Sequence, residues 1–236
     1  MASSNGGGTH CPSTKSDMDF NSSFISLSQY YQLQMDDILI LGSSSTEVNN
    51  LILALGTYFP VKDLGWLSYF LGVEATFTTN GLFLSQLKYI VDLLKRCNMI
   101  NCKPAETPMS AKEKVSVIVG QSFEDGYLYR SVVGSLQYLS FTRPDISFAV
   151  NKVCQFLHNT LDTHWIAVKR ILHYLKNTID YGIVIRKSLT SSLVAFSDDL
   201  TAYSDTDWGG CIDDRRSTGG HCVFFGPNLI SWSSRK

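Results

Sequence analysis

The chain has 236 residues, enough for one or two domains with a sizeable apolar core. Apolar residues make up 44% and charged residues 17%, a balance typical of globular proteins and unlike that of disordered ones. The net charge of −1 excludes the basic excess of a free-standing nucleic-acid-binding protein, so any contact with nucleic acid must depend on local basic patches.

The chain begins with a polar, glycine-rich segment, residues 1–22, which predicts a flexible tail. A half-apolar stretch, Ile25–Leu33, and an apolar run, Ile38–Leu41, then predict two strands. Asp36 and Asp37 lie between them, so we expect a tight turn that carries two carboxylates. Hard divalent cations such as Mg²⁺ prefer carboxylate ligands, and the alternative is an ordinary solvated turn.

Further elements are predicted before residue 98. Ser44-Ser45-Thr46-Glu47 has the form of a capping box and predicts a helix that ends at Pro60. Asn80-Gly81 predicts a hairpin turn. Ser85 is the expected cap of a second helix, with an apolar face formed by Ile90, Leu93, Leu94 and Cys97. Residues 98–125 contain two prolines and no periodic pattern, and they are the predicted linker between two subregions.

Apolar periodicity predicts three more helices, at about residues 127–139, 144–153 and 164–176. Thr142 is the expected cap of the second of these helices, and Pro144 fits its first turn. The last third of the chain then changes to strand patterns. The predicted strands are 181–185, 193–196, 202–204, 222–225 and 229–232, with turns at Asp213-Asp214 and Gly226-Pro227-Asn228.

The most basic local cluster consists of Lys169, Arg170 and Lys176 on the third helix, joined by Arg186 and Lys187. Two interpretations of this cluster remain open. It is either a solvated helix face or a surface that binds the phosphates of nucleic acid.

The six cysteines include no Cys-x-x-Cys pair and no Cys/His set with zinc-finger spacing, so no structural zinc site is expected. We interpret them as mostly reduced, buried thiols of an intracellular protein. No apolar run approaches the roughly 20 residues of a membrane span, and no secretory signal is evident, so no membrane contact is expected. The sequence does not determine the compartment: the nucleus, the cytoplasm and encoding by the mitochondrial genome all stay open.

Many short motifs follow one another in order from about residue 35 to residue 236. They are Met35–Gly42, Lys62–Gly65, Tyr69–Glu74, Leu84–Tyr89, Cys102–Pro104, Thr107–Met109, Tyr129–Gly134, Thr142–Ile146, His164-Trp165, Arg170–Leu172, Tyr203–Trp208, Arg215–Gly219 and Leu229–Ser234. Together these motifs resemble the Pol polyprotein of Ty1/copia-type retrotransposons. The chain is also similar to the short plant mitochondrial open reading frames derived from such elements.

The resemblance implies an α+β fold and a fragment of a reverse transcriptase that continues into a ribonuclease H. The implied divisions are a tail (1–22), a partial palm and thumb (23–110), a helical connection (111–180) and a truncated ribonuclease H-like segment (181–236). It also implies that Asp36 and Asp37 bind Mg²⁺ or Mn²⁺ in the polymerase, and that Asp205 is the first metal-binding acid of the ribonuclease H. An RNA/DNA template-primer is the implied partner.

We expect this chain to be catalytically incompetent. A polymerase palm needs a third, upstream aspartate, and only Asp17 and Asp19 precede the turn, in a polar segment. Gln34 stands where the family has tyrosine, the fingers are absent, and the ribonuclease H part contains only the first of its acids. Two other hypotheses stay open: a nucleic-acid-binding or interaction module retained from the thumb and connection, and a pseudogene product without a role.

Overall fold

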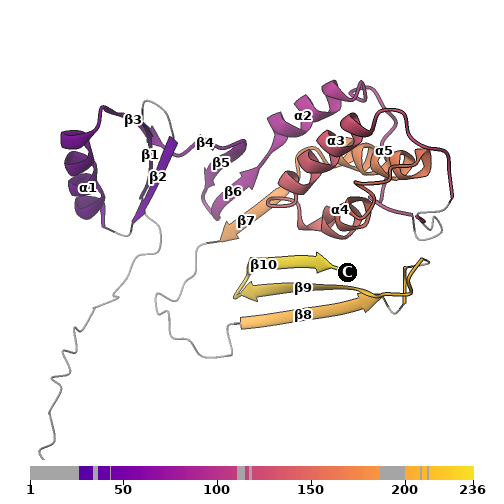
Figure 1. The fold of residues 1–236 in the computed structure, drawn as a ribbon. Coiled ribbons are helices and arrows are strands. Elements are labelled where there is room, and N and C mark those ends of the chain that lie inside the picture. The colour runs from indigo at the N-terminus through magenta and orange to yellow at the C-terminus, as the bar shows by residue number, and fades with distance from the viewer. Residues whose placement is uncertain are drawn as a thin grey trace, which may run out of the picture.

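The computed structural model describes residues 27–33, 37–42, 44–110, 115–116, 119–186, 200–207, 209–211 and 213–236. Within these residues the fold is α+β, with a group of helices and three antiparallel sheets (Figure 1). The strands are β1 Leu27–Leu33, β2 Asp37–Gly42, β3 Val61–Trp66, β4 Tyr69–Phe70, β5 Val73–Thr78, β6 Gly81–Ser85, β7 Gly182–Arg186, β8 Leu200–Asp207, β9 Thr218–Phe225 and β10 Asn228–Arg235. The α-helices are α1 Ser45–Tyr58, α2 Leu87–Arg96, α3 Gly126–Leu139, α4 Ser147–Cys154 and α5 Asp162–Asn177.

The first sheet has the strand order β2-β1-β3, and α1 packs on β2. The two predicted strands are confirmed, because β1 and β2 pair antiparallel with Gln32 opposite Asp37. The turn predicted between them lies outside the described residues. The predicted helix is confirmed too, and the side chain of Ser44 accepts a hydrogen bond from the backbone N–H of Glu47. Ile40 and Val48 form a small core between strand and helix, with Ile38, Ile52 and Leu55 packed against it.

The second sheet has the order β4-β5-β6-β7 and brings the predicted hairpin next to a strand about a hundred residues later in the chain. Gly81 starts β6 at a φ of +142°, and it lies opposite Arg186, the last residue of β7. A Cβ atom at this position would lie 2.1 Å from the carbonyl oxygen of Ile185. Glycine is therefore required here both by the backbone conformation and by the close approach of β7.

We expect Gly81→Ala to lower the free energy of unfolding by about 1–3 kcal/mol, because alanine is strained at this φ and collides with β7. Gly56→Ala is the matched control, since Gly56 lies in α1 and a Cβ atom there meets nothing within 4 Å. Because Gly56 is in a helix interior, its replacement should raise stability by about 0.5–1 kcal/mol. Urea-induced unfolding of both variants measures the difference, and equal shifts would contradict the argument.

The main core lies among α2, α3, α4 and α5. The apolar faces predicted for these helices are confirmed, with Ile90, Leu136, Ile146 and Leu172 all fully buried. The core includes residues on both sides of residue 110, where the sequence predicts a boundary. Two predicted caps are wrong. Ser85 ends β6, and the N-cap of α2 is Gln86 without a side-chain hydrogen bond.

The second wrong cap is Thr142. Residue Arg143, not Thr142, precedes a short 3₁₀-helix, Pro144–Ile146, which leads into α4. The hydroxyl of Thr142 instead donates to Oε1 of Gln86, at 2.7 Å, and both residues are buried. A local sequence pattern does not reveal this contact, because the two residues are 56 positions apart.

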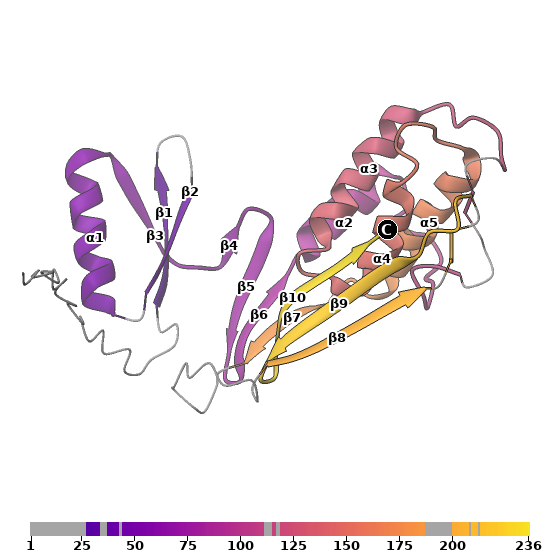
Figure 2. The ribbon, with the colours of Figure 1, turned by 60° about the horizontal axis from the view of Figure 1, so that its bottom comes forward.

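The third sheet has the order β10-β9-β8, and β10 is the strand next to the helices (Figures 1 and 2). The indole Nε1 of Trp232 donates to the carbonyl oxygen of Ser140 at 2.9 Å, which joins β10 to the end of α3. Strands predicted at 202–204, 222–225 and 229–232 are confirmed as parts of longer strands. The strand predicted at 193–196 lies outside the described residues.

Candidate functional site

The candidate catalytic aspartates, Asp36 and Asp37, come in the sequence where β1 leads into β2. Asp37 is the first residue of β2, and Asp36 and Gln34 lie outside the described residues, as does the side chain of Asp37. The hairpin is fixed from behind by α1. A Cβ atom on Gly42 would lie 2.6 Å from a methyl group of Val48, so this glycine allows the helix to approach the strand closely. The two strands on either side of the predicted turn are therefore paired and supported by α1, and the metal-binding role of Asp36 and Asp37 stays a prediction.

Asp205 lies on a different sheet, in the exposed edge strand β8. Its Oδ1 accepts a hydrogen bond from the backbone N–H of Thr206 at 2.8 Å. The family resemblance implies a central strand for this aspartate, but among the described residues β8 pairs with β9 alone. The structure thus places Asp205 and Asp37 in two separate sheets.

Asp205 lines a hollow of about 620 Å³, and the described residues of that lining include no second carboxylate. Its polar side chains include Arg235 together with His221 and Ser233, which contact each other at 3.1 Å. The other polar side chains in the lining are those of Ser204, Thr206, Ser231 and Trp232. Asp207, in the same strand as Asp205, has a structural role, because its Oδ1 accepts a hydrogen bond from the backbone N–H of Thr218 at the start of β9. Asp207 thereby closes the loop between the two strands.

The predicted basic cluster is only partly brought together. Lys169 and Lys176 are seven positions apart, so they lie on the same face of α5, and both are half-buried. Nη2 of Arg170 donates to the hydroxyl of Thr107 at 2.9 Å. Arg186 is at the end of β7 that points away from the helices (Figure 1). Lys187 lies outside the described residues.

An arginine that the sequence analysis did not single out is at the centre of the helical core. Arg143 is 1% exposed, and its guanidinium forms a bidentate pair with Asp145, at 2.9 and 2.6 Å. The same guanidinium donates to the carbonyl oxygen and the hydroxyl of Thr178, at 2.8 and 2.6 Å. It thus joins the entry of α4 to the end of α5. A planar fork of five N–H donors makes arginine suited to this position.

Burial alone would raise the pKa of Asp145, but hydrogen bonds and charge from Arg143 outweigh it and hold the pKa below its ordinary value. The hydroxyl of Tyr174 adds a further hydrogen bond to the carboxylate, at 2.8 Å. The guanidinium also lies over the rings of Tyr174 and Tyr181, at 5.6 and 5.5 Å. Every polar group in this network therefore has a partner that offsets the cost of burial.

His164 is the second buried polar anchor, at the start of α5. Its Nδ1 accepts the backbone N–H of Leu161 at 3.0 Å, so Nε2 carries the proton and donates to the carbonyl oxygen of Ser116 at 2.9 Å. The ring stacks on Phe156 with 3.9 Å between centroids. Burial is the main reason why the pKa of His164 is lowered, against the opposing effect of the Ser116 carbonyl and nearby carboxylates.

Comparisons with known proteins identify the family. A family model described as reverse transcriptase (RNA-dependent DNA polymerase) matches residues 25–111. Over 207 residues, the chain is 49% identical to the retrovirus-related Pol polyprotein from transposon RE1 of Arabidopsis thaliana. It is 45% identical to an uncharacterized mitochondrial protein of the same plant, a match that covers 88% of this chain and 83% of that protein. The chain belongs to the copia-type retrotransposon Pol family.

The match to copia-type Pol is partial in length. It covers 88% of this chain but 14% of the Pol polyprotein from transposon RE1. A more distant relative, the putative transposon Ty5-1 protein of Saccharomyces cerevisiae, is 29% identical over 209 residues. No solved structure matches the chain. No helix in the described part of the chain is both long and apolar enough to cross a membrane.

A divalent cation is the cofactor implied by membership of the copia-type Pol family. The two adjacent carboxylates of Asp36 and Asp37 are oxygen donors of the kind that Mg²⁺ and Mn²⁺ prefer, so the residues at the turn fit the group. Around Asp205 the described side chains provide one carboxylate, an imidazole and hydroxyl groups. The described residues include no group of three His, Cys, Asp or Glu side chains that could hold a metal ion.

Proposed function

We propose that this chain is the part of a copia-type reverse transcriptase that carries the Asp36-Asp37 turn, the helical thumb and connection, and the first strands of the ribonuclease H. The hairpin of β1 and β2, with Asp37 at the start of β2, is the observation that supports this assignment most directly. The hairpin lies within the residues matched by the reverse transcriptase family model. The divisions at residues 22, 110 and 180 belong to the same proposal.

In this proposal, Asp36 and Asp37 hold the divalent cation, which would neutralise charge as a phosphoryl group is transferred. The chain's own contribution is positioning. Antiparallel pairing with β1 fixes the start of β2, and the contact of Ile40 with Val48 holds β2 on α1. A carboxylate on a strand braced in this way keeps its place better than one on an unsupported loop.

We further propose that the isolated chain does not extend a primer. The support is the number of carboxylate donors, since Asp17 and Asp19 are the aspartates before Asp36 and the described lining of the hollow at Asp205 holds no second carboxylate. Purified protein with a primed RNA template and Mg²⁺ or Mn²⁺ should show no template-dependent extension. Extension that is lost in Asp36→Asn and kept in the control Asp19→Asn would overturn this proposal.

A second candidate function is binding of nucleic acid by α5. The supporting observation is that Lys169 and Lys176 share a face of the helix, two turns apart. If both lysines contact phosphates, removing them should reduce the magnitude of the slope of log affinity against log salt concentration by about 2. The test is binding of an RNA–DNA hybrid by Lys169→Ala/Lys176→Ala over a range of salt concentrations.

The control for this measurement is Lys88→Ala/Lys95→Ala, which removes the same charge from α2. If α5 contacts the phosphates, the α5 double variant loses affinity and the α2 double variant keeps it. Equal losses would show that net charge alone governs binding. An absence of binding at low salt in the unchanged protein would exclude the second function.

A further inference from the structure

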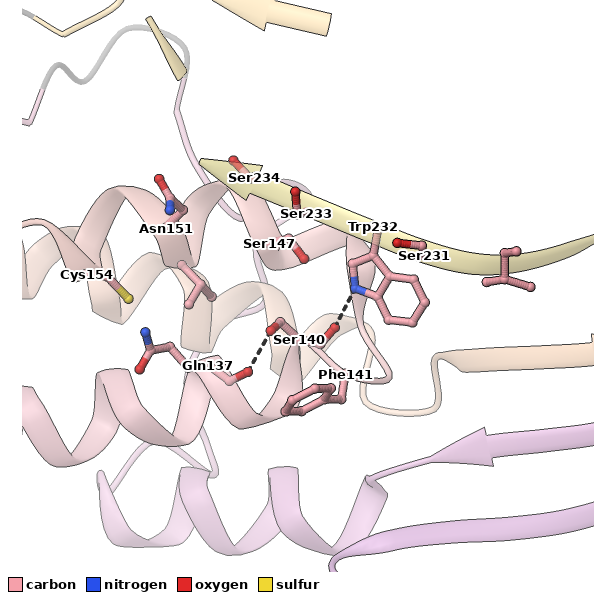
Figure 3. A pocket seen from close by; sticks show the side chains of 12 residues that line it. Gln137, Ser140, Phe141, Ser147, Asn151, Cys154, Ser231, Trp232, Ser233 and Ser234 are labelled. Atoms are coloured by element: carbon pink, nitrogen blue, oxygen red, sulfur yellow. Dashed lines mark hydrogen bonds between the residues drawn. The ribbon is translucent and has the colours of Figure 1, made fainter. Parts of the chain in front are cut away.

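A pocket of about 470 Å³ lies between the helices and the third sheet (Figure 3). One side is formed by the end of α3 and by α4, and the other by β10. The hydrogen bond from Trp232 to the carbonyl oxygen of Ser140 holds the two sides together at one end. The volume of the pocket falls within the range of about 300–1,000 Å³ that is usual for small-molecule sites.

The lining of this pocket carries no charged side chain. It consists of Gln137, Ser140, Phe141, Ser147, Val150, Asn151, Cys154, Ile230, Ser231, Trp232, Ser233 and Ser234. Burial raises the pKa of the Cys154 thiol to about 11, so this side chain is neutral as well. A charged ligand would lose its hydration without gaining a counter-charge, so the pocket is suited to a neutral ligand.

Two hydroxyl groups in the pocket are unsatisfied. Oγ of Ser147, on α4, and Oγ of Ser234, on β10, are buried and have no hydrogen-bond partner among the described residues. Each such group costs about 1–3 kcal/mol when buried without a partner. The two hydroxyls come from opposite walls (Figure 3). Rotation of each serine about its Cα–Cβ bond into another staggered rotamer would present its hydroxyl to one ligand between the walls.

The remaining polar and aromatic groups define the shape of that ligand. Phe141, which is 68% exposed, and Trp232 place two aromatic rings at one end of the pocket, and stacking on such rings favours a flat ligand. The amides of Gln137 and Asn151 bring both hydrogen-bond donors and acceptors to the lining. We propose that the pocket binds an unpaired nucleobase, a neutral flat heterocycle with hydrogen-bonding edges.

The test is a titration of the full chain with adenosine, guanosine, cytidine and uridine, followed by saturation-transfer NMR. At least one nucleoside should bind saturably, and its 5′-monophosphate should bind no more tightly because no cation lines the pocket. Ser147→Ala/Ser234→Ala should weaken binding by about fivefold to tenfold, since two modest hydrogen bonds are lost. Ser45→Ala, at the exposed start of α1, is the matched control and should leave binding unchanged.

A second measurement separates this role from a purely structural one. Without ligand, the double alanine variant should melt at the same temperature as the unchanged protein or higher, because it removes two unsatisfied buried hydroxyls. A lower melting temperature would show that the serines stabilise the fold instead. The proposal is also overturned if no nucleoside binds to the folded chain, if the double variant binds as tightly as the control, or if the monophosphates bind more tightly.

Discussion

Replacement of Arg143 by alanine is expected to lower the free energy of unfolding by about 3 kcal/mol, because it leaves the carboxylate of Asp145 and the carbonyl of Thr178 without their main partner. The removal of one member of a buried ion pair costs about 3–5 kcal/mol. The side chain of Asp145 is 32% exposed, so water compensates in part and the low end of the range applies. Urea unfolding followed by circular dichroism measures the loss.

Arg130→Ala is the control for this experiment, since Arg130 is exposed on α3 and its loss should change stability by less than about 0.5 kcal/mol. Arg143→Lys keeps the charge but cannot form the bidentate fork and the two bonds to Thr178 together, so it should remain clearly destabilised. If the lysine variant equals the unchanged protein, the charge rather than the geometry of the guanidinium accounts for the effect.

The pH dependence gives a further check on the Arg143 pair. Because the pKa of Asp145 is lowered in the folded protein, its stabilising contribution is present above its unfolded pKa of about 4. That contribution is lost as the pH falls through the lowered folded value. The gap in stability between the unchanged protein and Arg143→Ala should therefore narrow below about pH 4.

Helix faces were predictable from the sequence because they depend on local periodicity. Ile90, Leu93 and Leu94 are spaced three and four apart, and burial of one helix face follows from that spacing whatever the face packs against. The turn at Asn80-Gly81 was predictable for a similar reason. By contrast, β3 has no alternating pattern, and it is a strand because its backbone pairs with β1. Pairing of this kind depends on distant residues, so a local pattern does not contain it.

The candidate sites show the same division between local and distant information. Two strands with a turn at Asp36-Asp37 are encoded within about twenty residues, and the hairpin was therefore predictable. The basic cluster was inferred from closeness in sequence, but β7 carries Arg186 away from α5 to the turn at Gly81. Arg143 lies in the motif Thr142–Ile146, but its role could not be predicted locally because its partner Thr178 is 35 residues further along the chain.

The motif Thr142–Ile146 therefore has a structural explanation that needs no part in catalysis. Thr142 holds Gln86 at the start of α2, and Arg143 holds the end of α5. Pro144 begins the 3₁₀-helix, and Ile146 is fully buried in the core. Four consecutive helices are thus fixed relative to one another by a single pentapeptide. Family resemblance identifies such a motif, and only the contacts distinguish a structural role from a catalytic one.

Replacement of His164 by alanine is the second change with a large expected effect, a loss of about 3 kcal/mol at neutral pH. The substitution leaves the backbone N–H of Leu161 and the carbonyl of Ser116 without a hydrogen-bond partner, and each unsatisfied group costs about 1–3 kcal/mol. It also removes the ring that stacks on Phe156. His164→Asn provides an oxygen acceptor for Leu161 and should lose less. Thermal unfolding of both variants measures the order.

The sign of the pH effect follows from the lowered pKa of His164. Below its unfolded pKa of about 6.5, the unfolded chain binds a proton that the buried ring does not, so the unchanged protein loses stability as the pH falls. The alanine variant lacks this group, so the difference in free energy of unfolding between the unchanged protein and the variant should shrink from about pH 6.5 to pH 5. If the stability difference stays constant over this range, His164 takes up its proton at the same pH in the folded and unfolded chains, which contradicts a lowered pKa and an Nδ1 that accepts from Leu161.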